Sequence, residues 1–170
     1  MDAETLRSLQ TPLKDRYKTD PDAAIITLTA TGSLDGAGIA CRVETGRALI
    51  EAGLHPATGG SGIQACSGDM LLEALAACAG VTLKAVATAL EFNLTGGTVR
   101  AEGDLDFRGT LGVDKTAPVG FRAIRLNFEL GTTESAERIA LLHKLTERYC
   151  VVYQTIAGAT PVETVIAAAR

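Results

Sequence analysis

The stretch Ser67-Gly-Asp-Met-Leu-Leu-Glu-Ala-Leu-Ala-Ala-Cys78 decides how the chain folds, because it opens the longest apolar segment in the sequence. Ser67 is a residue type that caps helix N-termini, and Asp69 places a carboxylate in the first turn, where it complements the helix dipole. Small residues dominate the middle of the segment and permit close backbone approach. A buried helix over about 69–92 is therefore predicted at the centre of the fold.

This helix raises the question of a membrane span, because it is long and apolar. Glu73 and Lys84 interrupt it, however, and alanine and glycine dominate it. A core helix is the better interpretation, and no membrane partner is expected. Nucleic-acid binding is not expected either, because the chain of 170 residues has a net charge of -4 and no basic run.

Before the central helix, the spacing of apolar residues changes from that of a helix to that of a β-strand. Residues 3–18 have helical spacing up to the break at Asp20-Pro21-Asp22, which predicts an N-terminal helical segment over 1–22 and a single domain over 23–170. Three strands are then predicted as an antiparallel meander, with a hairpin turn over Gly32–Gly36. They cover Ala24–Ala30, Ile39–Val43 and Arg47–Glu51.

Residues after the central helix predict a second block of strands. Val99–Phe107 and Phe121–Leu130 alternate apolar and polar residues and are expected to pair. A helix over about 134–148 follows, with Ile139, Leu142 and Leu145 as its buried stripe, and then a short helix through Ile156 and a last strand over Val162–Ile166. The fold class is α+β, with its strands in two blocks.

Four cysteines lie at positions 41, 66, 78 and 150. They form no Cys-x-x-Cys pair and have only His55 and His143 to accompany them, so neither a metal site nor another cofactor is expected. Cys41 alternates with strand core residues and Cys66 lies in a glycine-rich loop; both are expected to be inert. Cys78 alone would also fit a small core residue in a helix of alanines.

Two stretches together, Ser67 to Cys78 and Glu147-Arg-Tyr-Cys150-Val-Val, resemble the OsmC/Ohr family of thiol-dependent hydroperoxide reductases. The resemblance implies an OsmC-like fold, with antiparallel strands around a long buried central helix, and an intertwined homodimer. It also implies that Cys78 attacks an organic hydroperoxide and Cys150 resolves the product as a disulfide. A small apolar hydroperoxide as substrate and an external dithiol as reductant follow from the same interpretation. A reducing, cytoplasmic location is expected separately, because the stretch Met1-Asp-Ala-Glu-Thr5 lacks the basic and apolar regions of a secretory signal.

The sequence also departs from the pattern of the family. Leu34 stands where the peroxidase branch usually has an arginine, Gly68 where it has a glutamate, and Val151 replaces the proline that commonly follows the second cysteine. Asp69 stands where other branches have an acid and is a candidate site residue that would orient an arginine. These departures keep open an alternative function, in which the same fold binds a hydrophobic small molecule and the thiols are vestigial.

Attack on a peroxide requires an ionised sulfur, and the middle of a helix gives little assistance from the dipole. A nearby cation or hydrogen-bond donor is therefore needed beside Cys78, and Arg42, Arg122 and Arg125 are the candidate cations. His55 and His143 are most simply surface residues. His55 precedes the thiol helix by a flexible stretch, which leaves entry into the site open.

Overall fold

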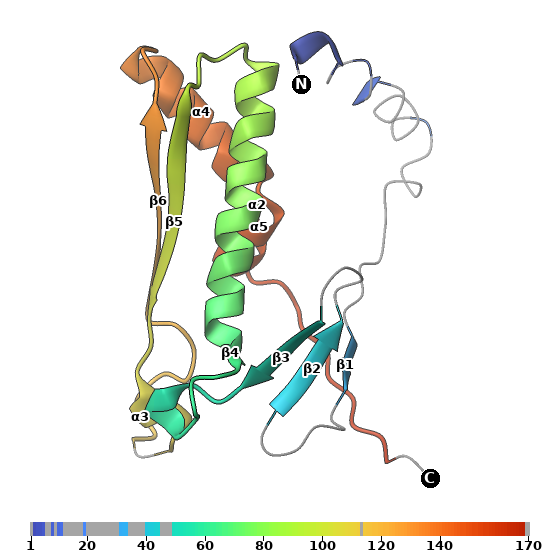
Figure 1. Cartoon of the computed structure of the whole chain (residues 1–170), viewed down its shortest axis with the longest axis vertical. Coiled ribbons are helices and arrows are strands. Elements are labelled where there is room, and N and C mark those ends of the chain that lie inside the picture. The colour runs from blue at the N-terminus through green and yellow to red at the C-terminus, as the bar shows by residue number, and fades with distance from the viewer. Residues whose placement is uncertain are drawn as a thin grey trace.

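The computed structural model describes residues 2–5, 8, 10–11, 19, 31–33, 40–44, 49–112 and 114–168. A long helix, α2 (Ser67–Ala89), runs beside a two-stranded sheet, and a small four-stranded sheet lies near the N-terminal end of α2 (Figure 1). This arrangement confirms the α+β class, the two blocks of strands and the central helix. The boundary proposed at residue 22 remains a prediction; residues 3–5, 8 and 10–11 are helical.

The small sheet has the order β1 (Thr31–Ser33), β2 (Ala40–Glu44), β3 (Leu49–Gly53) and β4 (Ala65–Cys66). The first three strands form an antiparallel meander, in which β2 and β3 overlap the second and third predicted strands, and β4 adds a short parallel pair with β3. The sequence predicted Gly32 in the hairpin turn. In the structure Gly32 belongs to β1 instead, where it pairs with Val43 of β2. The strand expected over Ala24–Ala30 lies outside the described residues.

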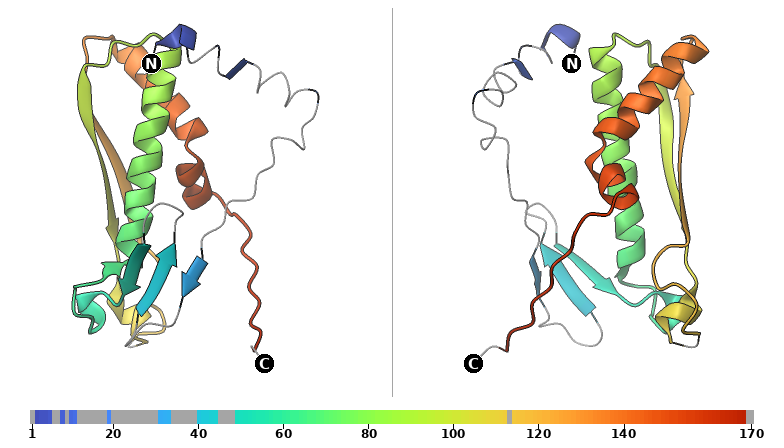
Figure 2. Two further views of the ribbon diagram at one scale, coloured as in Figure 1. Left: turned by 45° about the vertical axis from the view of Figure 1, so that its right-hand side comes forward. Right: turned by 180° about the vertical axis from the view of Figure 1, so that it is seen from behind.

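Helix α2 buries one face. Its buried residues Leu75, Ala79, Leu83 and Ala87 recur every fourth position, which is the spacing of one helix face. Val81, by contrast, is 71% exposed, so the single chain buries less of the helix than the sequence suggested. Length and composition alone would allow α2 to cross a membrane. Its packing against β5, α4 and α5 is that of a core helix (Figure 2).

The long sheet consists of β5 (Gly96–Asp104) and β6 (Ala123–Gly131), paired antiparallel along their whole length. Alternate β6 residues are half-buried, as the period of two predicted. The first strand ends earlier than predicted. Phe107 instead begins the short helix α3 (Phe107–Thr110), because the Asp106 carboxylate accepts the Arg108 N–H and caps that turn.

The core lies where α2 meets α4 (Ala136–Tyr149). Leu83, Ala87, Phe92 and Leu142 form its buried cluster. Of the predicted α4 stripe, Leu142 is buried, whereas Leu145 is half-buried and Ile139 is exposed. The Ser135 side chain accepts the Arg138 N–H and caps the start of α4.

The chain ends differently from the prediction. After α5 (Val151–Ala157), residues 159–168 run as an extended chain past the small sheet (Figure 2). The strand predicted over Val162–Ile166 does not form: these residues pair with no strand in the described part of the structure, and Ile166 is 99% exposed.

Candidate active site

The fold brings Cys78 and Cys150 together. Cys78 is part of the α2 surface that packs against α5. Cys150 occupies the corner between α4 and α5, where it is at once the C-cap of α4 and the N-cap of α5. Each thiol shifts the pKa of the other through hydrogen bonding, and both are free rather than joined. Cys150 is fully buried, whereas Cys78 is half-buried.

The surroundings of Cys78 favour its thiolate. Burial is the largest single influence and opposes ionisation, but four hydrogen bonds together outweigh it. They come from the Val152 N–H, the Cys150 thiol, the Thr82 hydroxyl and the Val151 N–H. The pKa of Cys78 therefore lies below the ordinary value for a thiol. Val151 and Val152 belong to the first turn of α5, whose free N–H groups point toward the sulfur.

The surroundings of Cys150 favour its neutral thiol. Burial raises the pKa of Cys150, and the hydrogen bond and negative charge of Cys78 raise it further. The Tyr153 N–H, which donates to the Cys150 sulfur over 3.5 Å, opposes this shift without cancelling it. The two thiols thus differ in protonation tendency, with Cys78 the one that ionises first.

The candidate cations are not the groups that lower the Cys78 pKa. Arg125 binds the Asp104 carboxylate at the far end of β5, with an N–O distance of 2.8 Å. Arg122 lies 4.0 Å from the Asp106 carboxylate. Each of these two candidate arginines faces a carboxylate near its own strand, and neither is among the groups that influence the Cys78 pKa. The side chain of Arg42 lies outside the described part of the structure.

The other candidate residues are not at the thiol pair. Asp69 is exposed in the first turn of α2, about 13 Å along the helix axis from Cys78, so its role in the site remains a prediction. Cys66 is half-buried at the end of β4. For Cys41 the structure describes only the backbone, which lies in β2 opposite Ala52.

The two histidines have separate surroundings. His55 is half-buried and caps the short helix η2 (Pro56–Thr58), since its Nδ1 accepts the Ala57 N–H over 3.0 Å. Its ring stacks on Phe107 with ring centroids 4.8 Å apart. His143 lies on the half-exposed face of α4, 3.6 Å from a Glu147 carboxylate oxygen.

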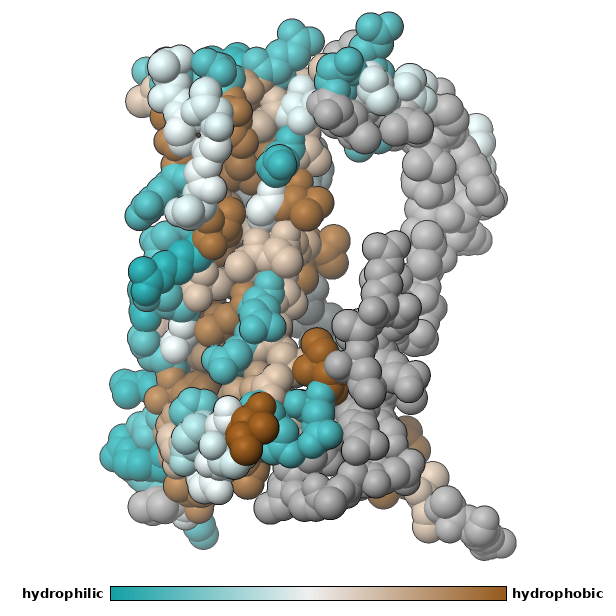
Figure 3. Space-filling model, in the orientation of Figure 1, coloured by the Kyte–Doolittle hydropathy of each residue, from teal (hydrophilic) through white to brown (hydrophobic). Residues whose placement is uncertain are grey.

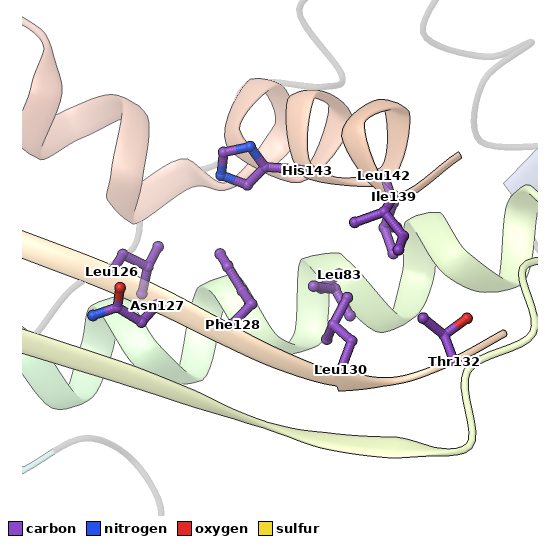
Figure 4. A pocket seen from close by; sticks show the side chains of 9 residues that line it. All are labelled: Leu83, Leu126, Asn127, Phe128, Leu130, Thr132, Ile139, Leu142 and His143. Carbon is purple, nitrogen blue, oxygen red and sulfur yellow. The ribbon is translucent and has the colours of Figure 1, made fainter. Parts of the chain in front are cut away.

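Two of the apolar cavities that border the long sheet also touch α4. The first, of about 350 Å³, lies between β6 and α4 with Leu83 of α2 beneath it (Figure 4). It is lined by Leu83, Leu126, Asn127, Phe128, Leu130, Thr132, Ile139, Leu142 and His143. The second, of about 380 Å³, reaches α2 at Leu75 and α5 at Tyr153. Neither cavity has a cysteine in its wall.

Three hydrogen-bond donors around Cys78 were not predicted from the sequence. Thr82 lies four residues after Cys78 on the same helix. This spacing places the two side chains next to each other, so the sequence alone could have indicated Thr82. The backbone N–H groups of Val151 and Val152 carry no signal in their residue types. Among the described residues, no cluster of three or more His, Cys, Asp and Glu has a metal-binding arrangement.

The family comparison and the structural comparison both match this chain to OsmC-like proteins. The chain matches the family described as OsmC-like protein over residues 59–165. An OsmC-like protein from Mycoplasma pneumoniae has a similar structure, with a TM-score of 0.64, 20% identity, and coverage of 78% of this chain and 89% of that chain. No protein with a curated function matches the chain.

Two proteins named for organic hydroperoxide resistance also share the fold. One, described as organic hydroperoxide resistance protein OsmC from Legionella pneumophila, has a TM-score of 0.61, 20% identity, and coverage of 79% of this chain and 92% of that chain. The other is the organic hydroperoxide resistance protein OhrB of Bacillus subtilis. It has a TM-score of 0.52, 18% identity, and coverage of 79% and 93%.

Proposed function

Because the chain belongs to the OsmC-like protein family, we propose that it reduces organic hydroperoxides with two thiols, Cys78 attacking and Cys150 resolving. The family includes proteins named for organic hydroperoxide resistance, which supports a peroxide-related role. The observation that carries the two-thiol proposal is the packing of α2 against α5, which brings Cys78 beside Cys150, with Cys78 the thiol that ionises more readily.

The first step uses the Cys78 thiolate. Its sulfur attacks one oxygen of the hydroperoxide, the O–O bond breaks, and the alkoxide takes a proton and leaves as an alcohol. Cys78 is thereby oxidised by two electrons to a sulfenic acid. The α5 N–H groups of Val151 and Val152 support this step, since they stabilise the negative sulfur before the attack.

The second step uses Cys150. Its sulfur attacks the Cys78 sulfur, an S–S bond forms as the S–O bond breaks, and the hydroxide leaves as water with the proton from Cys150. An external dithiol then reduces the disulfide by exchange. The mutual influence of the two thiols on their pKa values supports a direct closure, for which their Cα atoms must lie within about 7 Å.

A second candidate function is the binding of a hydrophobic small molecule. The apolar cavity between β6 and α4 favours it, because about 350 Å³ lies within the range of small-molecule sites (Figure 4). Leu34 and Gly68, at positions where the peroxidase branch has charged residues, favour it as well. Under this alternative the thiols would show ordinary reactivity.

We also propose that the protein acts as a homodimer in the cytoplasm. OsmC proteins generally form homodimers. Leu71 and Val81 of α2 are exposed, and a second subunit would cover them. Figure 3 shows hydrophobic residues on this face of the molecule. A reducing compartment accords with the free thiols of Cys66, Cys78 and Cys150.

The deciding experiment measures consumption of cumene hydroperoxide with dithiothreitol as reductant. We expect Cys78→Ser to abolish consumption and Cys66→Ser, the matched control, to leave it unchanged. Mass spectrometry of the non-reduced protein after one equivalent of hydroperoxide should find Cys78 joined to Cys150. Equal consumption by Cys78→Ser would eliminate the enzymatic proposal, and binding of an apolar dye without consumption would support the alternative.

A further inference from the structure

The corner that holds Cys150 is fastened by backbone groups of α4. The last carbonyls of a helix lack partners within it. Here the Thr146 carbonyl accepts the Cys150 N–H over 3.0 Å, and the Glu147 carbonyl accepts the Gln154 side-chain amide over 2.8 Å. The end of α4 is thus bonded both to the resolving residue and to α5.

Glu147 and Tyr153 add a side-chain connection across the same corner. Glu147 lies three residues before Cys150 on α4, and Tyr153 lies three residues after it on α5. Both line the second cavity. The charge of Glu147, then burial, then hydrogen bonding to Glu147 raise the pKa of Tyr153, so the phenol keeps its proton and is available to donate to the carboxylate.

The backbone of Tyr153 reaches the sulfur itself. Its N–H donates to Cys150 Sγ over 3.5 Å, so any movement of Tyr153 away from α4 changes the surroundings of the resolving thiol. Neither the Glu147 carboxylate nor the Tyr153 phenol is among the groups that bond to Cys78. Their side chains therefore act on the corner rather than on the attacking sulfur.

We propose that Glu147 and Tyr153 are a positioning pair, whose phenol–carboxylate bond ties the first turn of α5 to the last turn of α4 and keeps Cys150 buried beside Cys78. The inference deepens the proposed function, because a closed corner keeps the resolving thiol in reach of a sulfenic acid. The burial of Cys150, however, is a property of the corner that can be measured without any peroxide.

The test uses Cys78→Ser protein and iodoacetamide, with alkylation of Cys150 followed by peptide mass. Tyr153→Phe removes only the hydroxyl and keeps the N–H on the sulfur. We expect it to speed alkylation of Cys150 about fivefold. Losing one hydrogen bond makes local opening of the corner between α4 and α5 more favourable by roughly this factor. Tyr149→Phe is the matched control, because Tyr149 is 62% exposed on the same corner, and it should leave the rate unchanged.

Glu147 is tested in the same background. Glu147→Ala should speed alkylation as Tyr153→Phe does, and the double variant should be no faster than the faster single one, since both remove the same bond. Glu147→Gln keeps an acceptor oxygen and should recover part of the protection, which also covers the case in which the alanine variant does not fold. Rates equal to that of Tyr149→Phe, or additive effects in the double variant, would overturn the proposal.

The test of the Glu147–Tyr153 pair can fail or succeed independently of the test of hydroperoxide reduction. In protein that retains Cys78, Tyr153→Phe should raise the yield of sulfenic acid trapped by dimedone about fivefold at an unchanged rate of hydroperoxide consumption in the first turnover. Failure of the wild-type protein to consume hydroperoxide would refute the enzymatic proposal alone. The alkylation rates would still decide whether Glu147 and Tyr153 hold the corner closed.

Discussion

Cys78 and Cys150 shift each other's pKa in opposite directions. Hydrogen bonding from Cys150 helps to lower the pKa of Cys78, and the charge of the Cys78 thiolate adds to burial in keeping the Cys150 proton in place. A pair of thiols with a defined order of ionisation has a defined order of reaction, because the thiolate is the nucleophile. This asymmetry agrees with the roles that we propose.

Thr82 contributes a hydroxyl to this asymmetry. Thr82→Val keeps the shape of the side chain and removes the donor, so the pKa of Cys78 is expected to rise toward the ordinary thiol value. The pH dependence of iodoacetamide labelling at Cys78 measures this shift. Thr82→Ser retains the hydroxyl and is the matched control. If Thr82→Val and the wild type give the same labelling midpoint, the hydroxyl does not stabilise the thiolate.

The spacing of apolar residues predicted α2 and β6 well, because a period of 3.6 indicates the buried face of a helix and a period of 2 that of a strand. The boundaries that failed depend on tertiary partners. Phe107 continues the alternation of β5 but begins α3, since Asp106 caps a turn there. Val162–Ile166 has a strand sequence, yet a strand also needs a neighbouring strand, and none of the described strands pairs with it.

The site was predictable in part. The motifs around Cys78 and Cys150 indicated the pair, and the requirement for a donor beside Cys78 was sound. The identity of the donors was not predictable, because a backbone N–H has the same chemistry in every residue type except proline. The sequence also could not reveal that Arg125 is occupied by Asp104, which is close to it only through the pairing of β5 with β6.

Leu142 and its neighbour Leu141 offer a matched test of the core. Leu142 is 1% exposed in the cluster between α2 and α4, whereas Leu141 is 43% exposed. Leu142→Ala is expected to lower the free energy of unfolding by about 2–5 kcal/mol, since it removes apolar contacts and leaves a cavity. Leu141→Ala should cost far less. Urea unfolding followed by circular dichroism measures both, and equal losses would contradict the core assignment.

Gly103 has no room for a side chain. A Cβ at this position in β5 would lie 2.4 Å from a ring carbon of Phe121, well inside van der Waals contact. Gly103→Ala should therefore destabilise the protein by about 1–3 kcal/mol, although alanine is otherwise better tolerated in a strand. Gly120→Ala is the control, because its Cβ would meet no atom within 4 Å. Equal midpoints of thermal unfolding for the two variants would contradict the close contact.

Asp106 is expected to give the clearest acid transition in the loop region. Hydrogen bonding from the Arg108 side chain, 2.6 Å away, is the largest cause that lowers the pKa of Asp106 from 3.8 to about 2. Because the folded value is the lower one, the contribution to stability is present above pH 3.8 and is lost as the pH falls toward 2. An NMR titration of the carboxyl carbon should place the folded midpoint near the lower value.

Removal of the partner tests the cause of this shift. Arg108→Gln should return the Asp106 midpoint toward the ordinary value and weaken the acid dependence of unfolding between pH 3.8 and about 2. Arg100→Gln removes an arginine that pairs with Glu102, at 3.1 Å, and should leave Asp106 unaffected. An Asp106 midpoint that moves equally in both variants would show that net charge, rather than the Arg108 contact, controls the titration of this carboxylate.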